Sequence, residues 1–202
     1  MKVKVCGMTQ ADNIRQVEAL GVDMMGFIFY AKSPRCLRQM PAYMPIHAQR
    51  VGVFVNESIE NIAICAERYG LDYIQLHGDE SPEQCHDLRL QGLELIKAFP
   101  MATADDLCAV EAYEGLCRYY LFDTKTPQRG GSGSSFDWNL LQQYQGTTPF
   151  LLSGGIHPNS YHELNAFHHP QWAGIDLNSR FETAPGVKDP ESISTLMEHL
   201  KI

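Results

Sequence analysis

The sequence lacks the features of an exported, membrane-spanning or nucleic-acid-binding protein. No apolar run approaches the length of a membrane helix, and the apolar start of the chain is too short for a signal peptide. The net charge of −8 comes from scattered acidic residues, whereas a nucleic-acid surface needs clustered Lys and Arg. The six cysteines form no CxxC pair, which favours a reducing, cytoplasmic environment.

Motifs for metal and cofactor chemistry are also missing. The sequence contains eight histidines, but none forms HExxH or another metal-ligand spacing. There is no GxGxxG after the first predicted strand, no Walker sequence for a nucleotide, and no GxSxG elbow for Ser-His-Asp chemistry. We therefore expect no metal and no cofactor.

Short runs rich in Val, Ile, Phe and Tyr recur along the whole chain, each followed by a turn and a stretch of helical period. The predicted strands are residues 2–6, 24–30, 50–55, 73–77, 93–99, 119–123, 150–153 and 173–177. Regular alternation of this kind predicts an α/β protein in which residues 1–202 form one small (β/α)8, or TIM, barrel. An open, doubly wound sheet is the alternative.

In such a barrel the reactive groups come from the carboxyl ends of the strands. Cys6 ends the first predicted strand, and Asp123 ends the sixth directly after an apolar run. A carboxylate facing the mouth of the barrel is costly without a partner or a function, so the two side chains are candidates for an acid and base pair. For Cys6, a buried small apolar residue is the other interpretation.

Two turns after the last strands predict a phosphate site. Gly154 and Gly155 follow the seventh strand, while Asn178 and Ser179 follow the eighth, before a short helix start. Free backbone amides and a helix dipole at these positions favour a dianion. The alternative is that the glycines only shape a tight turn.

Two other segments are candidates for binding. Arg35 follows the second strand, where its planar fork would suit a carboxylate, although a solvated loop charge is the alternative. The segment from Thr124 to Ser135 is rich in Gly, Ser and Thr, which is typical of a lid or ligand clamp. The alternative is a surface loop without a binding function. Its proposed lid residues are Gly130, Gly131, Ser132 and Gly133.

The sequence resembles the phosphoribosylanthranilate isomerase family over nearly its whole length, including the candidate positions described above. The matching segments, in order along the chain, are KVCGMT, GFIF with SPR, VGVFVN, IQLHGDE, FDTKTPQRGGSGSSFDW, LLSGGI and IDLNSRFETAPGVKD. Segments such as LHGDE and ETAPGVKD are not general features of barrels. The resemblance implies a cofactor-free Amadori rearrangement of N-(5-phosphoribosyl)anthranilate in tryptophan biosynthesis.

The resemblance also assigns roles. Cys6 would be the general base and Asp123 the general acid, Arg35 would hold the anthranilate carboxylate, and His77 would lie near the ribose. Gly154, Gly155, Asn178 and Ser179 would lie at the phosphate. The chain departs from many relatives at Arg180, where Gly is common, and at Ser134, where a basic residue is common, so the phosphate loop geometry and the lid contacts stay open.

On solution pKa values the roles would be reversed, with the carboxylate as base and the thiol as acid. We therefore expect apolar surroundings and the anionic substrate to raise the pKa of Asp123, and local amides to lower the pKa of the Cys6 thiol. The alternatives are a related phosphosugar isomerase or epimerase and a non-catalytic phosphate-binding barrel. The expected partner is a small phosphosugar, without nucleic acid or membrane, and the expected state is a monomer or weak homodimer.

Overall fold

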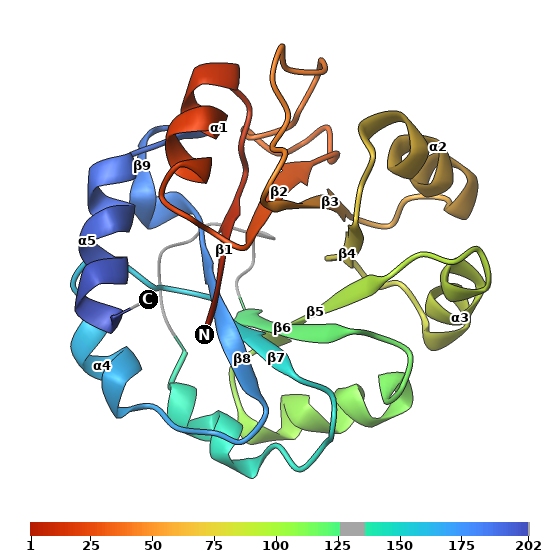
Figure 1. Cartoon of the computed structure of the whole chain (residues 1–202). Coiled ribbons are helices and arrows are strands. Elements are labelled where there is room, and N and C mark those ends of the chain that lie inside the picture. Colours follow the sequence, from red (N-terminus) through yellow and green to blue (C-terminus); the bar gives the residue numbers. More distant parts are fainter. Residues whose placement is uncertain (126–135, 202) are drawn as a thin grey trace.

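A computed structural model of the chain describes residues 1–125 and 136–201, and its centre is a closed barrel of eight parallel strands (Figure 1). The strands are β1 (Lys2–Cys6), β2 (Met24–Ile28), β3 (Gln49–Phe54), β4 (Tyr73–Leu76), β5 (Leu95–Met101), β6 (Tyr119–Thr124), β7 (Phe150–Leu152) and β8 (Trp172–Leu177). Each strand pairs with the next, and β8 pairs with β1 to close the ring. The predicted barrel is confirmed, and the open sheet is excluded.

Side chains alternate between the inside of the barrel and the helical layer around it. In β1, Val3 and Val5 pack into the core beneath the helices, whereas Cys6 belongs to a separate cluster inside the barrel. In β6, Phe122 packs outward and Leu121 packs inward. Successive residues of a strand point to opposite sides. Whether a polar residue occupies an odd or an even position in its strand therefore decides whether its side chain reaches the barrel interior.

Helices surround the barrel (Figure 1). The α-helices are α1 (Ala11–Glu18), α2 (Ile59–Tyr69), α3 (Pro82–Leu90), α4 (Tyr161–Ala166) and α5 (Pro190–Leu200), and the 3₁₀-helices are η1 (Ala104–Tyr113), η2 (Trp138–Gln143) and η3 (Ser179–Phe181). Helix α2 has local signals at both ends, since Ser58 Oγ accepts from the Asn61 N–H and Gly70 ends the helix in the left-handed region. No helix in the described ranges is long and apolar enough to cross a membrane.

The connection between β2 and β3 corrects one expectation. Helical period was predicted after every strand, but residues 29–48 form turns and irregular chain, seen as the orange loop in Figure 1. Pro34, Pro41 and Pro45 explain this, because each lacks the N–H that a helix interior requires. A bridge between Ile28 and Cys36 holds the segment against the end of β2, which positions Arg35 beside the barrel rim.

A small hairpin follows β8 and was not predicted. Strands β9 (Glu182–Ala184) and β10 (Val187–Lys188) pair antiparallel across a turn that contains Gly186, whose φ is +85°. The hairpin is anchored to the start of the chain, because Thr9 Oγ1 donates to the Gly186 carbonyl at 2.8 Å and Asn13 bonds to both backbone groups of Lys188. These contacts bring Glu182 and Lys188 close to the end of β1.

Candidate active site

The predicted site residues in the described part of the chain follow one another around the carboxyl rim of the barrel. Their order along the ring is Arg35 after β2, Cys6 at the end of β1, Asn178 and Ser179 after β8, Gly154 and Gly155 after β7, and Asp123 in β6. His77 directly follows β4. The candidate acid and base therefore lie three strands apart, and both turns of the predicted phosphate site lie between them.

Cys6 points into the barrel against a strand position that has no side chain. Its residue is 3% exposed and packs with Met24 and Leu151 in the inner cluster. Gly26 on β2 lies beside it, and a Cβ built there would lie 2.6 Å from the Cys6 Sγ. Gly7 and Met8 both donate to the Gly26 carbonyl, at 2.9 and 3.0 Å, which fixes the chain where it leaves β1. Gly26 thus makes the space that the thiol occupies.

A buried ion pair lies on the same side of β1 as Cys6. The Lys4 Nζ donates to Asp176 Oδ1 of β8 at 2.7 Å, and the Lys4 and Asp176 side chains are 0% and 5% exposed. Burial alone would lower the pKa of Lys4, but Asp176 and Cys6 raise it on balance, so the lysine is a cation. Ser153 Oγ lies 3.5 Å from the other Asp176 oxygen, which extends the contact to the turn after β7.

The electrostatic environment of Cys6 corrects a prediction. Burial raises the pKa of the Cys6 thiol, and the opposing influences come from the ammonium groups of Lys4 and Lys188, with Asp176 adding to the rise. Local amides were expected to lower this pKa. That expectation is wrong, because the cost of placing a negative sulfur inside the barrel outweighs the favourable interactions around it.

Asp123 faces His77 across the mouth. His77 Nε2 lies 3.5 Å from Asp123 Oδ2, and both side chains are partly exposed. The other ring nitrogen of His77 lies 2.9 Å from Nε2 of the buried Gln75 side chain, and the backbone N–H of Thr124 donates to Asp123 Oδ1 at 2.8 Å. Each side chain is therefore held on one edge and remains partly exposed to solvent.

The turn after β7 brings backbone N–H groups next to Asp123. Gly154 and Gly155 have φ values of +79° and +76°, and a Cβ at Gly154 would lie 2.3 Å from Thr124 Oγ1 and 3.0 Å from Asp123 Oδ1. Only glycine fits this position without moving the end of β6. Within residues 1–125 and 136–201, the N–H groups of Gly154 and Gly155 have no backbone hydrogen-bond acceptor. Ser179 begins η3, so its N–H also has no partner within the helix.

Arg35 lies in a cluster of charged side chains next to Gly7. Its Nε donates to both Glu182 oxygens at 2.9 Å, and its Nη2 donates to Oε2 at 2.7 Å. Lys188 Nζ donates to Glu182 Oε1 at 2.6 Å and to Asn178 Oδ1 at 2.8 Å. A Cβ at Gly7 would lie 2.9 Å from the Arg35 Cδ and 3.1 Å from Asn178 Oδ1, so these side chains pack over the loop that follows Cys6.

This charged cluster also shifts the titration of its members. Burial raises the pKa of Glu182, but the bonds from Arg35 and Lys188 lower it on balance, so the group is a carboxylate. Burial lowers the pKa of Lys188 despite the attraction of Glu182. The guanidinium of Arg35 therefore already binds the Glu182 carboxylate through Nε and Nη2. Its Nη1 has no hydrogen-bond partner among the residues that the structure describes.

Lys4, Glu182 and Lys188 were not among the site residues predicted from the sequence. For Lys4 a signal was available, since a lysine two residues before Cys6 in a buried strand must point to the same side of the sheet. For Glu182 and Lys188 the available signal was the Pro185-Gly186 pair between them, which marks a turn, but the strands on either side are too short to show a period.

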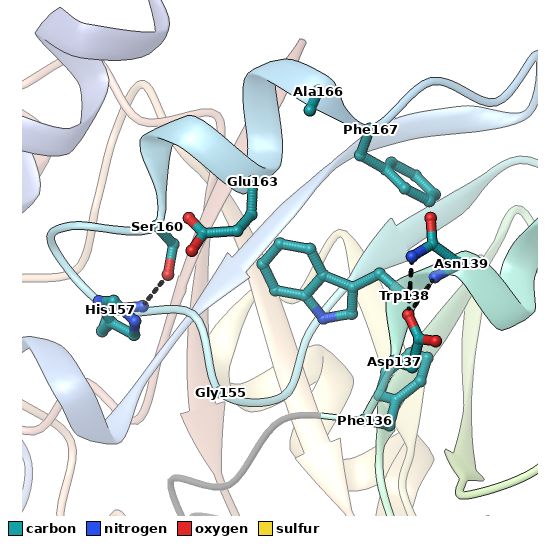
Figure 2. Close-up of a pocket in the computed structure, with 10 residues that line it drawn as sticks. All are labelled: Phe136, Asp137, Trp138, Asn139, Gly155, His157, Ser160, Glu163, Ala166 and Phe167. Carbon is teal, nitrogen blue, oxygen red and sulfur yellow. Dashed lines mark hydrogen bonds between the residues drawn. The ribbon is translucent and has the colours of Figure 1, made fainter.

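A pocket of about 370 Å³ lies beside the rim, between η2 and α4 (Figure 2). Figure 2 shows the Trp138 ring across it, with Glu163 and Phe167 of the α4 side nearby and the Gly155 turn below. Trp138 Nε1 is buried without a hydrogen-bond partner within the described ranges. Of the predicted site residues, Gly155 lines the pocket, so the pocket adjoins the predicted phosphate turn.

Some predicted features lie outside the described residues. These are the lid residues Gly130, Gly131, Ser132 and Gly133, together with the departure at Ser134. The other departure, Arg180, lies in η3 next to Phe181, which is fully buried in the core. Searched over the described ranges, the side chains contain no group of three or more His, Cys, Asp or Glu that could hold a metal ion.

Comparisons with known proteins agree on one family. The family model for N-(5'phosphoribosyl)anthranilate (PRA) isomerase matches residues 3–199. An N-(5'-phosphoribosyl)anthranilate isomerase of Phocaeicola vulgatus is 53% identical over 201 residues, covering 100% of this chain and 98% of the relative. A solved phosphoribosyl anthranilate isomerase in complex with reduced 1-(o-carboxyphenylamino)-1-deoxyribulose 5-phosphate has a TM-score of 0.85 and 31% identity, over 100% of this chain and 98% of that one. Monomers generated from the dimeric Thermotoga maritima enzyme have a TM-score of 0.83 and 30% identity, with the same coverage.

Proposed function

The chain belongs to the N-(5'-phosphoribosyl)anthranilate isomerase family, and on this basis we propose that Cys6 and Asp123 are its catalytic base and acid. The reaction is the Amadori rearrangement of N-(5-phosphoribosyl)anthranilate to 1-(2-carboxyphenylamino)-1-deoxyribulose 5-phosphate, a step of tryptophan biosynthesis. Two proton transfers are required. The carboxyl group protonates the ring oxygen, the ring opens to a Schiff base, and the thiolate removes the proton at C2 to give an enolamine that tautomerises.

The observation that carries the proposal is the order of groups around the rim. An acid in β6 and a base in β1 are separated by the two turns after β7 and β8, whose glycine amides and helix start suit a phosphate. A substrate with its phosphate on Gly154, Gly155, Asn178 and Ser179 would place its sugar between Asp123 and Cys6. His77, 3.5 Å from Asp123, would then lie near the ribose.

Arg35 would hold the anthranilate carboxylate. It follows β2, next to Cys6 on the side away from the phosphate turns, so an aromatic ring attached to C1 would reach it. Glu182 holds two of its three nitrogens, which fixes the guanidinium plane and leaves Nη1 for a ligand. An orientation fixed in advance reduces the entropy lost when the substrate binds.

Loss of either reacting group tests the assignment. Replacing Cys6 with Ser and Asp123 with Asn should each lower kcat by at least about 100-fold, the usual contribution of general acid-base catalysis. The measurement is turnover of phosphoribosylanthranilate, followed by the loss of its anthranilate-type fluorescence. Near-normal turnover by Asp123→Asn would refute its role as the acid. Turnover of another phosphosugar in preference to this substrate would instead favour a related isomerase.

We also propose that residues 1–202 act as one catalytic domain, as a monomer or weak homodimer in the cytoplasm. One solved relative, from Thermotoga maritima, is described as dimeric and was also obtained as monomers. The biosynthetic reaction of the family supports the cytoplasmic location, which fractionation of cells would test.

A further inference from the structure

The Lys4–Asp176 ion pair is costly for a barrel interior. The Lys4 side chain has no exposed surface, and its contact with Asp176 joins β1 to β8 across 172 positions of sequence. Apolar residues of similar volume often stabilise a buried site at least as well as an ion pair does. Stability alone therefore does not explain a buried ion pair at this position, and its neighbour on the same side of β1 is Cys6.

Charged groups from three elements act on the Cys6 thiol. They are Lys4 from β1, Asp176 from β8 and Lys188 from β10. After burial, which raises the pKa of Cys6, the largest influence is the charge of Lys4, which lowers it, followed by Asp176, which raises it, and Lys188, which lowers it. Lys188 is already bonded to Glu182 and Asn178, at 2.6 and 2.8 Å. Lys4, in contrast, is fully buried two residues before Cys6 in β1 and points to the same side of the strand, so it is the main cation available to a negative sulfur.

We propose that Lys4 is a positioning residue whose ammonium, held in place by Asp176, stabilises the thiolate of Cys6. The inference rests on the proposed role of Cys6 as the base. In the reaction the thiolate takes the C2 proton and becomes a thiol, the electron pair stays on the substrate as the enolamine, and Lys4 keeps its own proton throughout. Asp176 fixes the lysine while partly opposing its effect on the sulfur.

Two substitutions with opposite expected effects test this inference. In Lys4→Met the Cys6 pKa should rise by about 1 to 3 pH units, the usual effect of an opposite charge at close range. In Asp176→Asn the same pKa should fall. The measurement is the ultraviolet absorbance of the thiolate against pH, after subtraction of the same variant carrying Cys6→Ser, which removes the signal of the other five cysteines.

A double variant and a matched control separate this effect from simple destabilisation. Lys4→Met with Asp176→Asn leaves no unpaired buried charge, and its thiol should titrate above that of the unsubstituted protein because Lys4 has the larger influence. Lys97 is the control, since it is 3% exposed and its Nζ lies 3.1 Å from Glu80 Oε2, but it packs outward near Phe99 and Tyr113. Lys97→Met should leave the Cys6 titration unchanged.

The acid limb of kcat/KM should follow the thiol, because this limb reports ionisation of the free enzyme. At pH values below this limb, Lys4→Met should lose about tenfold in kcat/KM for every pH unit by which the thiol pKa rises. Equal thiol titration in Lys4→Met, Asp176→Asn and the unsubstituted protein would overturn the inference, and so would pKa changes in the same direction. Thiol pKa changes as expected, with an unmoved acid limb, would support the inference about Lys4 and refute Cys6 as the base.

Discussion

At the scale of single residues, the site depends on positions where a side chain is absent. Gly26 leaves room for the Cys6 sulfur, and Gly154 allows its turn to approach Asp123. The sequence motifs pointed to Gly154 through its place after the seventh strand. Gly26 carried no such signal, because its importance arises from a neighbouring strand, in which Cys6 pairs with it in parallel register.

Gly26→Ala should impair both stability and activity. The new Cβ would lie 2.6 Å from Sγ and 3.0 Å from the Cα of Cys6, so β1 must shift and the thiol must turn away. We expect a loss of about 1 to 3 kcal/mol in unfolding free energy, typical of overpacking, measured by urea denaturation. We also expect a lower kcat with a smaller change in KM. Unchanged kcat would show that the sulfur position tolerates movement.

At the scale of secondary structure elements, the β9–β10 hairpin completes the site. It supplies Glu182, which holds the guanidinium of Arg35, and Lys188, which bonds to Asn178. The segment around Arg35 lacks the predicted helix, and a bridge to Ile28 together with the Glu182 contact orders it instead. A short hairpin and an irregular loop thus position Arg35, which lies outside the strands and helices of the barrel.

Glu182→Gln should destabilise the protein in a pH-dependent way. Removing one partner of a buried ion pair typically costs about 3 to 5 kcal/mol. Glu182 has a pKa below its usual 4.5 in the folded chain, so its stabilisation is fully present above pH 4.5 and is lost as the pH falls through the lower folded value. Urea denaturation at several pH values should therefore show the two proteins converging in acid. A constant difference down to strongly acidic pH would contradict the charge-based explanation.

At the scale of the whole molecule, barrel closure brings the residues of the candidate active site together. Strands β1 and β8 pair through four registered positions, from Lys2 with Gly174 to Val5 with Leu177. This pairing brings Lys4 to Asp176 and places the turn after β8 next to the end of β1. An open sheet would leave these groups at opposite edges.

The distribution of exposed apolar side chains on the surface indicates whether the protein forms a stable dimer. Large apolar side chains that are at least half exposed among the described residues occur on separate elements, with Ile46 before β3, Ile64 on α2 and Leu90 on α3. Single exposed apolar residues are normal for a monomer, whereas an obligate dimer needs a larger continuous patch. Sedimentation equilibrium should therefore give the mass of one 22.7 kDa chain at low concentration, with dimer only at high concentration. A dimer that persists on dilution would contradict this.

The sequence by itself determined the eight-strand alternation, the approximate positions of the strands to within two residues, and Cys6 and Asp123 as candidates. These follow from periods and turn residues that act over a few positions of chain, and β1 matches its predicted bounds. The family motifs added the expected place of His77 near the ribose, and they named the carboxylate that Arg35 would hold as that of anthranilate.

Only the tertiary structure decided which charges meet. Lys4 with Asp176 and Arg35 with Glu182 are pairs separated by 172 and 147 positions. Their contact depends on strand register around a closed ring, and so does the balance of burial and charge that raises the pKa of Cys6. Burial and long-range charge are properties of the assembled barrel, so no segment of the chain contains them alone.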